Sequence, residues 1–196
     1  IRNCDWSSDV CSSDLGGNWS TRTHVPLARA RADIWMPQLA VDAQDRVWVI
    51  WCEQTDLTRH ESGNWDLYAR ALEGNTWGKL IRLTSDPKPD INPHVAIDAK
   101  RNIHVVWQAH PDNTGDIMYC RFDGERWSSP LAVTSGSDSD WYPQVAIDEQ
   151  GTAWIAFDSY RNGDYDVFLL RVEDGAQAPY LHNYCRSWAD AFDDFE

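Results

Sequence analysis

The pattern Pro-x-x-Ala-x-Asp occurs three times in this chain, and this repetition constrains the fold more than any other feature of the sequence. The copies begin at residues 37, 93 and 143. After a short turn, each copy is followed by an apolar run rich in β-branched and aromatic residues, at residues 47–51, 103–107 and 153–157. Internal repeats at such spacings are typical of solenoids, propellers and arrays. The chain is therefore expected to consist of repeated structural units.

Two further segments recur in the same order within each unit. One lies at residues 65–70, 116–121 and 165–171, and the other at residues 75–84 and 125–134. Short β-branched or aromatic segments separated by Gly, Asp, Asn or Pro indicate strands joined by turns, and four strands per repeat form the blade of a β-propeller. The second strand is apolar at nearly every position, as expected when neighbouring blades cover both of its faces. We therefore predict an all-β fold, a β-propeller fragment with about three four-stranded antiparallel blades.

The repeats also predict where the blades begin and end. Residues 16–34 are expected to hold the last strand of a preceding blade, residues 35–90 and 91–140 two blades, and residues 141–172 a partial blade. Residues 173–196 are interpreted as a tail that supplies either a fourth strand or a ragged end. Residues 5–15 (DWSSDVCSSDL) resemble a translated sequencing adapter, so residues 1–15 are interpreted as an unstructured artefact. On this interpretation the gene is cut on its N-terminal side, and a signal peptide is not observable.

Charge and composition exclude several classes of function. The formal net charge of −14 repels phosphate backbones and anionic lipids, so neither nucleic acid nor a membrane surface is an expected partner. No run of 18 apolar residues occurs, so no membrane span is predicted. The five cysteines include no Cys-x-x-Cys pair, and Gly-x-Ser-x-Gly, His-Glu-x-x-His and P-loop motifs are absent from the sequence. We therefore predict no metal, no cofactor and no catalytic residue, and a binding role is favoured over an enzymatic one.

The repeated aspartates and tryptophans have structural interpretations. Asp42, Asp98 and Asp148 each precede a turn, where an aspartate side chain accepts backbone N–H groups in an Asx-type turn. This interpretation is favoured over a ring of metal-binding carboxylates. Trp77 and Trp127, in the fourth segment, are expected to pack between blades.

A candidate binding site lies in the loops that enter the first strand and leave the second strand of each blade. In a propeller these loops share one face at the mouth of the channel, and loops on a rigid scaffold often bind ligands. Aromatic rings beside carboxylates suit a sugar, because its apolar face stacks on the ring and its hydroxyl groups bond to the carboxylates. The alternatives are solvated loops whose aromatic side chains pack on the first strand, or a Ca²⁺ site at residues 138 and 140. The predicted ligand-binding residues are Asp90, His110, Asp140, Trp141, Tyr142, Tyr160 and Arg161.

Two segments resemble known propeller families. Residues 83–93, with Leu-Thr-Ser-Asp-Pro followed by Asp-Ile-Asn-Pro, and residues 157–168 are similar to the repeats of TolB-like (WD40-like) propellers. Where those repeats carry Ser-Pro-Asp-Gly after the first strand, this chain has Ala-Val-Asp or Ala-Ile-Asp, which looks more like sialidase-type propellers. The spacing of the sialidase Asp-box is not matched, so no catalytic residue is carried over. The resemblance implies a periplasmic or extracellular bacterial protein.

Together these features predict a non-catalytic propeller domain of an extracytoplasmic bacterial protein, which binds a glycan, peptide or protein on its top-face loops. The alternative is a fragment of, or an accessory domain to, a sialidase-like or other secreted hydrolase. A structural scaffold without a small ligand is the third interpretation.

Overall fold

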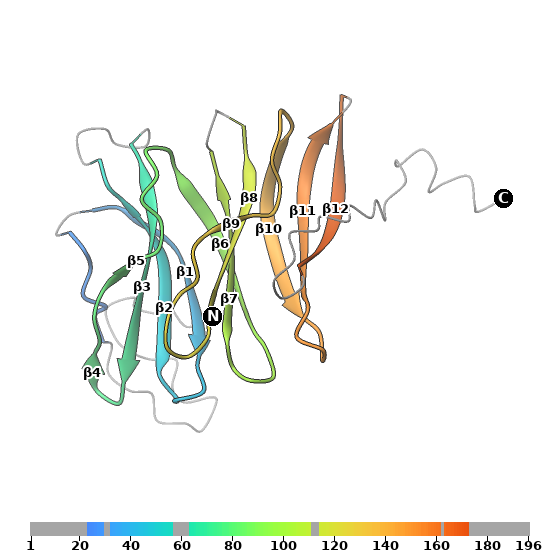
Figure 1. The fold of residues 1–196 in the computed structure, drawn as a ribbon. Coiled ribbons are helices and arrows are strands. Elements are labelled where there is room, and N and C mark those ends of the chain that lie inside the picture. The colour runs from blue at the N-terminus through green and yellow to red at the C-terminus, as the bar shows by residue number, and fades with distance from the viewer. Residues whose placement is uncertain (1–22, 30–31, 57–62, 111–113, 162, 173–196) are drawn as a thin grey trace, which may run out of the picture.

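The computed structural model describes residues 23–29, 32–56, 63–110, 114–161 and 163–172, which form three antiparallel β-sheets (Figure 1). The first sheet contains β1 (Ile34–Val41), β2 (Val47–Gln54), β3 (Trp65–Glu73), β4 (Thr76–Trp77) and β5 (Ile81–Arg82). The second sheet contains β6 (Asp90–Ile97), β7 (Ile103–Ala109), β8 (Asp116–Phe122) and β9 (Leu131–Ala132). The third sheet contains β10 (Ser139–Ile147), β11 (Ala153–Arg161) and β12 (Asp164–Val172).

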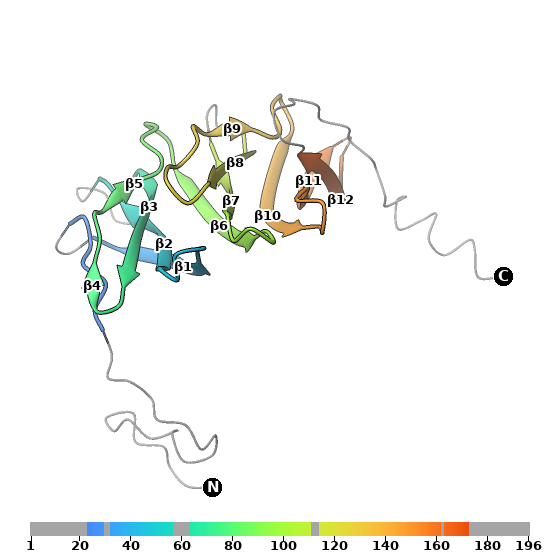
Figure 2. The ribbon, with the colours of Figure 1, turned by 60° about the horizontal axis from the view of Figure 1, so that its bottom comes forward.

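Each sheet corresponds to one copy of the sequence repeat, and the three sheets stand side by side in an arc (Figure 2). The prediction of an all-β propeller-type fold is thus confirmed. The predicted fourth strand is reduced to short pieces, β4, β5 and β9. In the second sheet Pro130 directly precedes β9, and proline has no N–H to donate to a ladder. The predicted artefact at residues 1–15 and the tail at residues 173–196 lie outside the described residues.

The sheets pack face to face through two buried clusters. The cluster between the first and second sheets includes Ile50, Leu67, Val105, Trp107 and Phe122. The cluster between the second and third sheets includes Val106, Ile117, Ile155, Phe157 and Leu170. Strand β7 is buried at every position because both of its faces are covered, whereas burial alternates along β11. A strand with one covered face shows that alternation. Among the described residues, no helix is long and apolar enough to cross a membrane.

An aspartate side chain holds the turn between the first and second strands of the first sheet. Oδ1 of Asp42 accepts hydrogen bonds from the backbone N–H groups of Gln44 (2.9 Å) and Arg46 (3.0 Å). Oδ2 accepts hydrogen bonds from Nε1 of Trp48 (2.8 Å) and Nε of Arg46 (2.6 Å). The predicted Asx-type turn is confirmed, and the same carboxylate also fixes a core indole.

The other two repeats keep the Asx-type turn but differ in the side chains that reach the second carboxylate oxygen. Asp148 accepts the backbone N–H groups of Gln150 (3.0 Å) and Thr152 (2.8 Å) and Nε1 of Trp154 (2.9 Å). In the second sheet His104 replaces the tryptophan, and its Nε2 lies 3.6 Å from Oδ2 of Asp98. The interval of six residues between the aspartate and the tryptophan or histidine therefore reflects a side-chain contact.

Replacing Asp42 with alanine is expected to lower the free energy of unfolding by about 2 kcal/mol, because the buried indole N–H of Trp48 loses its acceptor. Asp148→Ala is expected to cost clearly less, since Trp154 is half-buried and water can replace the carboxylate. Burial raises the pKa of Asp42, but the hydrogen bonds from Trp48 and Arg46 outweigh it and hold this pKa below its ordinary value. The contribution of Asp42 is thus present above a pH of about 4 and is lost as the pH falls through the native pKa. Urea unfolding at pH 7 measures the loss of stability in both variants. A larger loss for Asp148→Ala than for Asp42→Ala would contradict this prediction.

Candidate functional site

A repeated β-bulge shapes the upper end of each sheet, where the first strand begins (top of Figure 1). The register of the first strand shifts between Trp35 and Gln38 in β1, and at the equivalent positions of β6 and β10. The residue before the repeated proline has a positive φ in every case, namely 54° at Met36, 55° at Asn92 and 52° at Tyr142. Such a φ is unusual for a bulky side chain, and bulges are known to redirect side chains. The bulge leaves Tyr142 63% exposed.

An arginine–aspartate pair lies at the upper end of the third sheet. Nη2 of Arg161 donates a hydrogen bond to Oδ1 of Asp140 (3.2 Å), and its Nε donates one to Oγ of Ser159 (2.7 Å). The guanidinium carbon lies 4.7 Å from the ring centroid of Phe168, within the range of a cation–π contact. Oδ2 of Asp138 lies 3.7 Å from Nε of Arg161. Arg161 is therefore held in one position by contacts on several sides.

Aromatic side chains contact one another next to this pair, on the neighbouring residues of β10 and β11 and on β12. The ring centroids of Tyr160 and Tyr165 are 4.8 Å apart, and those of Trp141 and Tyr165 are 5.8 Å apart. Tyr160 is 43% exposed and Tyr165 is 63% exposed. The structure thus brings four of the seven predicted residues into contacts, Asp140 with Arg161, and Trp141 and Tyr160 each with Tyr165, and Tyr142 follows Trp141 in the chain. We call the six residues Asp140, Trp141, Tyr142, Tyr160, Arg161 and Tyr165 the third-sheet cluster.

Sequence reasoning missed Tyr165, although the repeat contained a signal for it. Tyr165 precedes the third-strand aspartate, at the position that Trp65 occupies in the first sheet. There the rings of Trp35 and Trp65 stack with centroids 4.5 Å apart. Trp141 is the repeat equivalent of Trp35, and Tyr165 is the equivalent of Trp65. The repeat therefore indicated that aromatic residues of the first and third strands pair at these positions.

Of the two remaining predicted residues, Asp90 begins β6 and His110 directly follows β7, and both have mainly internal contacts. Asp90 is fully buried and accepts a hydrogen bond from Nε1 of Trp107 (2.9 Å). Burial raises the pKa of Asp90 to about 7, against the lowering effect of hydrogen bonds from Thr84 and Trp107. The ring nitrogens of His110 lie 3.2 Å from the carbonyl oxygen of Pro89 and 3.0 Å from Nε2 of Gln108. In this conformation Asp90 is therefore not accessible to a ligand.

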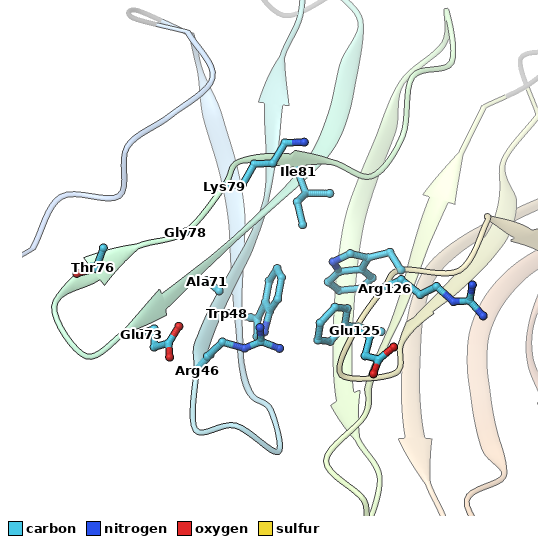
Figure 3. A pocket seen from close by; sticks show the side chains of 12 residues that line it. Arg46, Trp48, Ala71, Glu73, Thr76, Gly78, Lys79, Ile81, Glu125 and Arg126 are labelled. Carbon is cyan, nitrogen blue, oxygen red and sulfur yellow. The ribbon is translucent and has the colours of Figure 1, made fainter.

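A pocket that the sequence did not predict lies at the other end of the molecule. It has a volume of about 770 Å³ and lies between the first sheet and the turn that follows β8 (Figure 3). Trp48 and Trp127 both line it, and their ring centroids are 5.5 Å apart in an edge-to-face arrangement. The predicted packing of Trp127 between blades is confirmed. The pocket itself was not visible in the sequence, because it is assembled from two repeats.

Several solved structures share this fold. A thermostable family-43 glycoside hydrolase has a TM-score of 0.51 and 12% identity, and the match covers 78% of this chain and 59% of that one. An endo-arabinase from Bacteroides thetaiotaomicron VPI-5482 has a TM-score of 0.51 and 15% identity, covering 80% of this chain and 62% of that one. The polysaccharide lyase Uly1 has a TM-score of 0.52 and 10% identity, covering 76% of this chain and 40% of that one.

The match thus spans less than two thirds of each of these proteins, and such low identities show a common fold alone. No protein-family model matches the sequence, and a search of curated proteins finds no match.

Proposed function

We propose that this chain is a non-catalytic, glycan-binding propeller module whose sugar site is the third-sheet cluster. The observation that carries the proposal is the combination of exposed aromatic rings with a fixed arginine–aspartate pair. The apolar face of a sugar ring can stack on Tyr160 and Tyr165. Its hydroxyl groups can bond to Arg161 and Asp138, whose side chain is 48% exposed.

The comparisons favour a glycan over a peptide as the ligand. The structures that share the fold include a glycoside hydrolase, an endo-arabinase and a polysaccharide lyase. Polysaccharides of this kind are met outside the cytoplasm, so we place the module in the periplasm or outside the cell. The TolB-like and sialidase-type character of its repeats is consistent with that location.

The geometry of the cluster favours binding over hydrolysis. A glycosidase of the usual kind needs two carboxyl groups on either side of the scissile bond, one of them ready to donate a proton. Asp140 is 2% exposed and paired with Arg161, and Asp138 lies 3.7 Å from the same guanidinium group. These contacts suit a carboxylate that positions its neighbours rather than one that transfers protons to a ligand.

Replacing Tyr160 or Arg161 with alanine is expected to weaken sugar binding by about tenfold, which corresponds to about 1.4 kcal/mol of lost stacking or hydrogen bonding. Calorimetric titration with arabinotriose, xylotriose and galactotriose provides the measurement. Leu39→Ala is the matched control, because Leu39 is 69% exposed on β1 and lies outside the cluster. If both variants bind these sugars as tightly as the wild type does, the sugar site does not lie in the third-sheet cluster. Release of reducing ends from these sugars would instead support the hydrolase alternative.

A further inference from the structure

The third sheet has an open apolar face on the side away from the second sheet. In the second sheet Val106 and Ile117 are fully buried because they pack on the third sheet. Their repeat equivalents in the third sheet are Ala156, which is half-buried, and Val167, which is 50% exposed. Among the described residues, no further sheet lies against this side. We call Ala146, Ala156, Val167 and Leu169 the open face, because their equivalents Ala96, Val106, Ile117 and Tyr119 all pack on the third sheet.

The first sheet carries the matching apolar side at the opposite end of the arc (Figure 2). Val145 and Ile155 of the third sheet are 5% and 0% exposed, because they pack on the second sheet. Their repeat equivalents in the first sheet are Leu39, which is 69% exposed, and Val49, which is half-buried. Leu39 and Val49 are paired across β1 and β2 and therefore lie on the same side of the sheet. This Leu39 side thus has the residue types that receive a preceding sheet at the two junctions inside the molecule.

A segment with the sequence of a fourth strand lies against the Leu39 side. The tripeptide Pro-Leu-Ala occurs at residues 26–28 and again at residues 130–132, where its last two residues form β9 and pair with β8. Residues 26–28 belong to no strand, but the backbone N–H of Ala28 donates a hydrogen bond to Oε2 of Glu53 (3.1 Å), on the same side of β2 as Val49. Among the described residues, the third sheet has only three strands and ends at β12. The chain therefore holds a fourth-strand sequence at its first sheet and an edge that lacks a fourth strand at its third.

We propose that two copies of this chain join head to tail through these surfaces and close a ring of six sheets. The open face of one copy packs on the Leu39 side of the other, as each sheet packs on the next inside one chain. The register of β9 on β8 then places Leu27 of one copy opposite Leu169 of the other, and Ala28 opposite Phe168, so that the edge of β12 gains a fourth strand. Propellers have about 4–8 blades, and two copies of three sheets give the one multiple of three within that range. Because the two junctions are identical, a two-fold axis closes the ring.

The test measures the mass of the whole chain in solution by light scattering, with one arginine variant for each surface. The wild type is expected to be a dimer at about 0.15 M salt, which screens the repulsion between two copies of charge −14. Val167→Arg and Leu39→Arg are each expected to weaken the dimer at least tenfold, because a charge would enter an apolar contact. Gln150→Arg is the control, since Gln150 is exposed in a turn and lies on neither surface. Circular dichroism checks that each variant is folded.

An equimolar mixture of Val167→Arg and Leu39→Arg tests the head-to-tail arrangement. The Leu39→Arg copy keeps its open face and the Val167→Arg copy keeps its Leu39 side, so the mixture is expected to form a dimer with one intact junction. If Leu39→Arg alone stays dimeric, two open faces meet each other and the head-to-tail arrangement is wrong. A monomeric wild type, a mass that keeps rising with concentration, or equal weakening by Gln150→Arg would overturn the closed ring.

Sugar titration of the Leu39→Arg variant keeps this proposal separate from the proposed function, on which it does not rest. Trp65, the repeat equivalent of Tyr165, is 3% exposed and packs in the cluster between the first and second sheets, so a partner copy would also contact Tyr165. In a monomeric variant the third-sheet cluster has no such neighbour. Sugar binding by this variant together with a monomeric wild type would refute the dimer and leave the proposed function standing. A dimeric wild type whose monomeric variant binds no sugar would do the reverse.

Discussion

Replacing Gly115 with alanine is expected to lower the free energy of unfolding by about 3 kcal/mol, because the second and third sheets touch through backbone at this glycine. A Cβ at residue 115 would lie 2.5 Å from the carbonyl oxygen of Asp140 and 3.1 Å from Cδ1 and Nε1 of Trp141. The backbone N–H of Asp140 also donates a hydrogen bond to the carbonyl oxygen of Gly115 (2.7 Å). Backbone atoms cannot rotate away as a flexible side chain can, so the sheets must separate.

Thermal unfolding should place Gly115→Ala about 6–12 °C below the wild type, on the scale of a domain of this size. Gly78→Ala is the matched control, since its added Cβ would meet nothing closer than 3.5 Å. The separation of the second and third sheets also displaces Trp141, so Gly115→Ala is expected to weaken sugar binding at the third-sheet cluster as well as stability. A melting temperature within about 2 °C of the control would show that the two sheets adjust to the methyl group, and the argument for a rigid junction would fail.

The contrast between Gly115 and its repeat partners shows what the sequence could and could not predict. The repeat predicts that residues 65, 115 and 165 are equivalent and lie where the third strand begins, and β3, β8 and β12 each begin within one residue of these positions. It does not predict that the neighbouring sheet approaches this point closely enough to require glycine. The sequence repeat predicts the hydrogen-bonded strand pairing within one sheet. Contacts between two sheets depend instead on how two different repeats face each other.

The same limit applies to the candidate site. The loop positions predicted that Asp140, Trp141, Tyr142, Tyr160 and Arg161 would gather, because the first and second strands of one sheet pair there. By the same reasoning Asp90 and Asp140 are equivalent, and both are indeed buried at the start of their strands. Their partners differ, however: Arg161 neutralises Asp140, whereas Trp107 gives Asp90 a neutral N–H group. Which group partners a buried carboxylate depends on individual side chains that differ between the repeats. The repeat pattern therefore does not predict these partners.

Asp90→Asn is expected to stabilise the protein at pH 8 and to leave it nearly unchanged at pH 4. Burial raises the pKa of Asp90 from 3.8 to about 7, and the nearby carboxylates Asp86 and Asp66 act in the same direction. The folded protein therefore holds a proton that the unfolded chain releases above a pH of about 4, and stability falls as the pH rises from about 4 to 7. The gap between the folded and unfolded pKa values corresponds to about 4 kcal/mol of lost stability above pH 7, an upper value for a single carboxyl group.

Asparagine is neutral at every pH and keeps an oxygen that can accept the indole N–H of Trp107. The difference in unfolding free energy between Asp90→Asn and the wild type should therefore grow from near zero at pH 4 to several kcal/mol at pH 8, with about 4 kcal/mol as its ceiling. Asp158→Asn, an exposed position on β11, is the control and should show no such rise. Urea unfolding at half-unit pH intervals measures both differences. A difference that stays constant across this range, or a loss of stability in Asp90→Asn at pH 8, would mean that the buried carboxyl is stabilised as an anion.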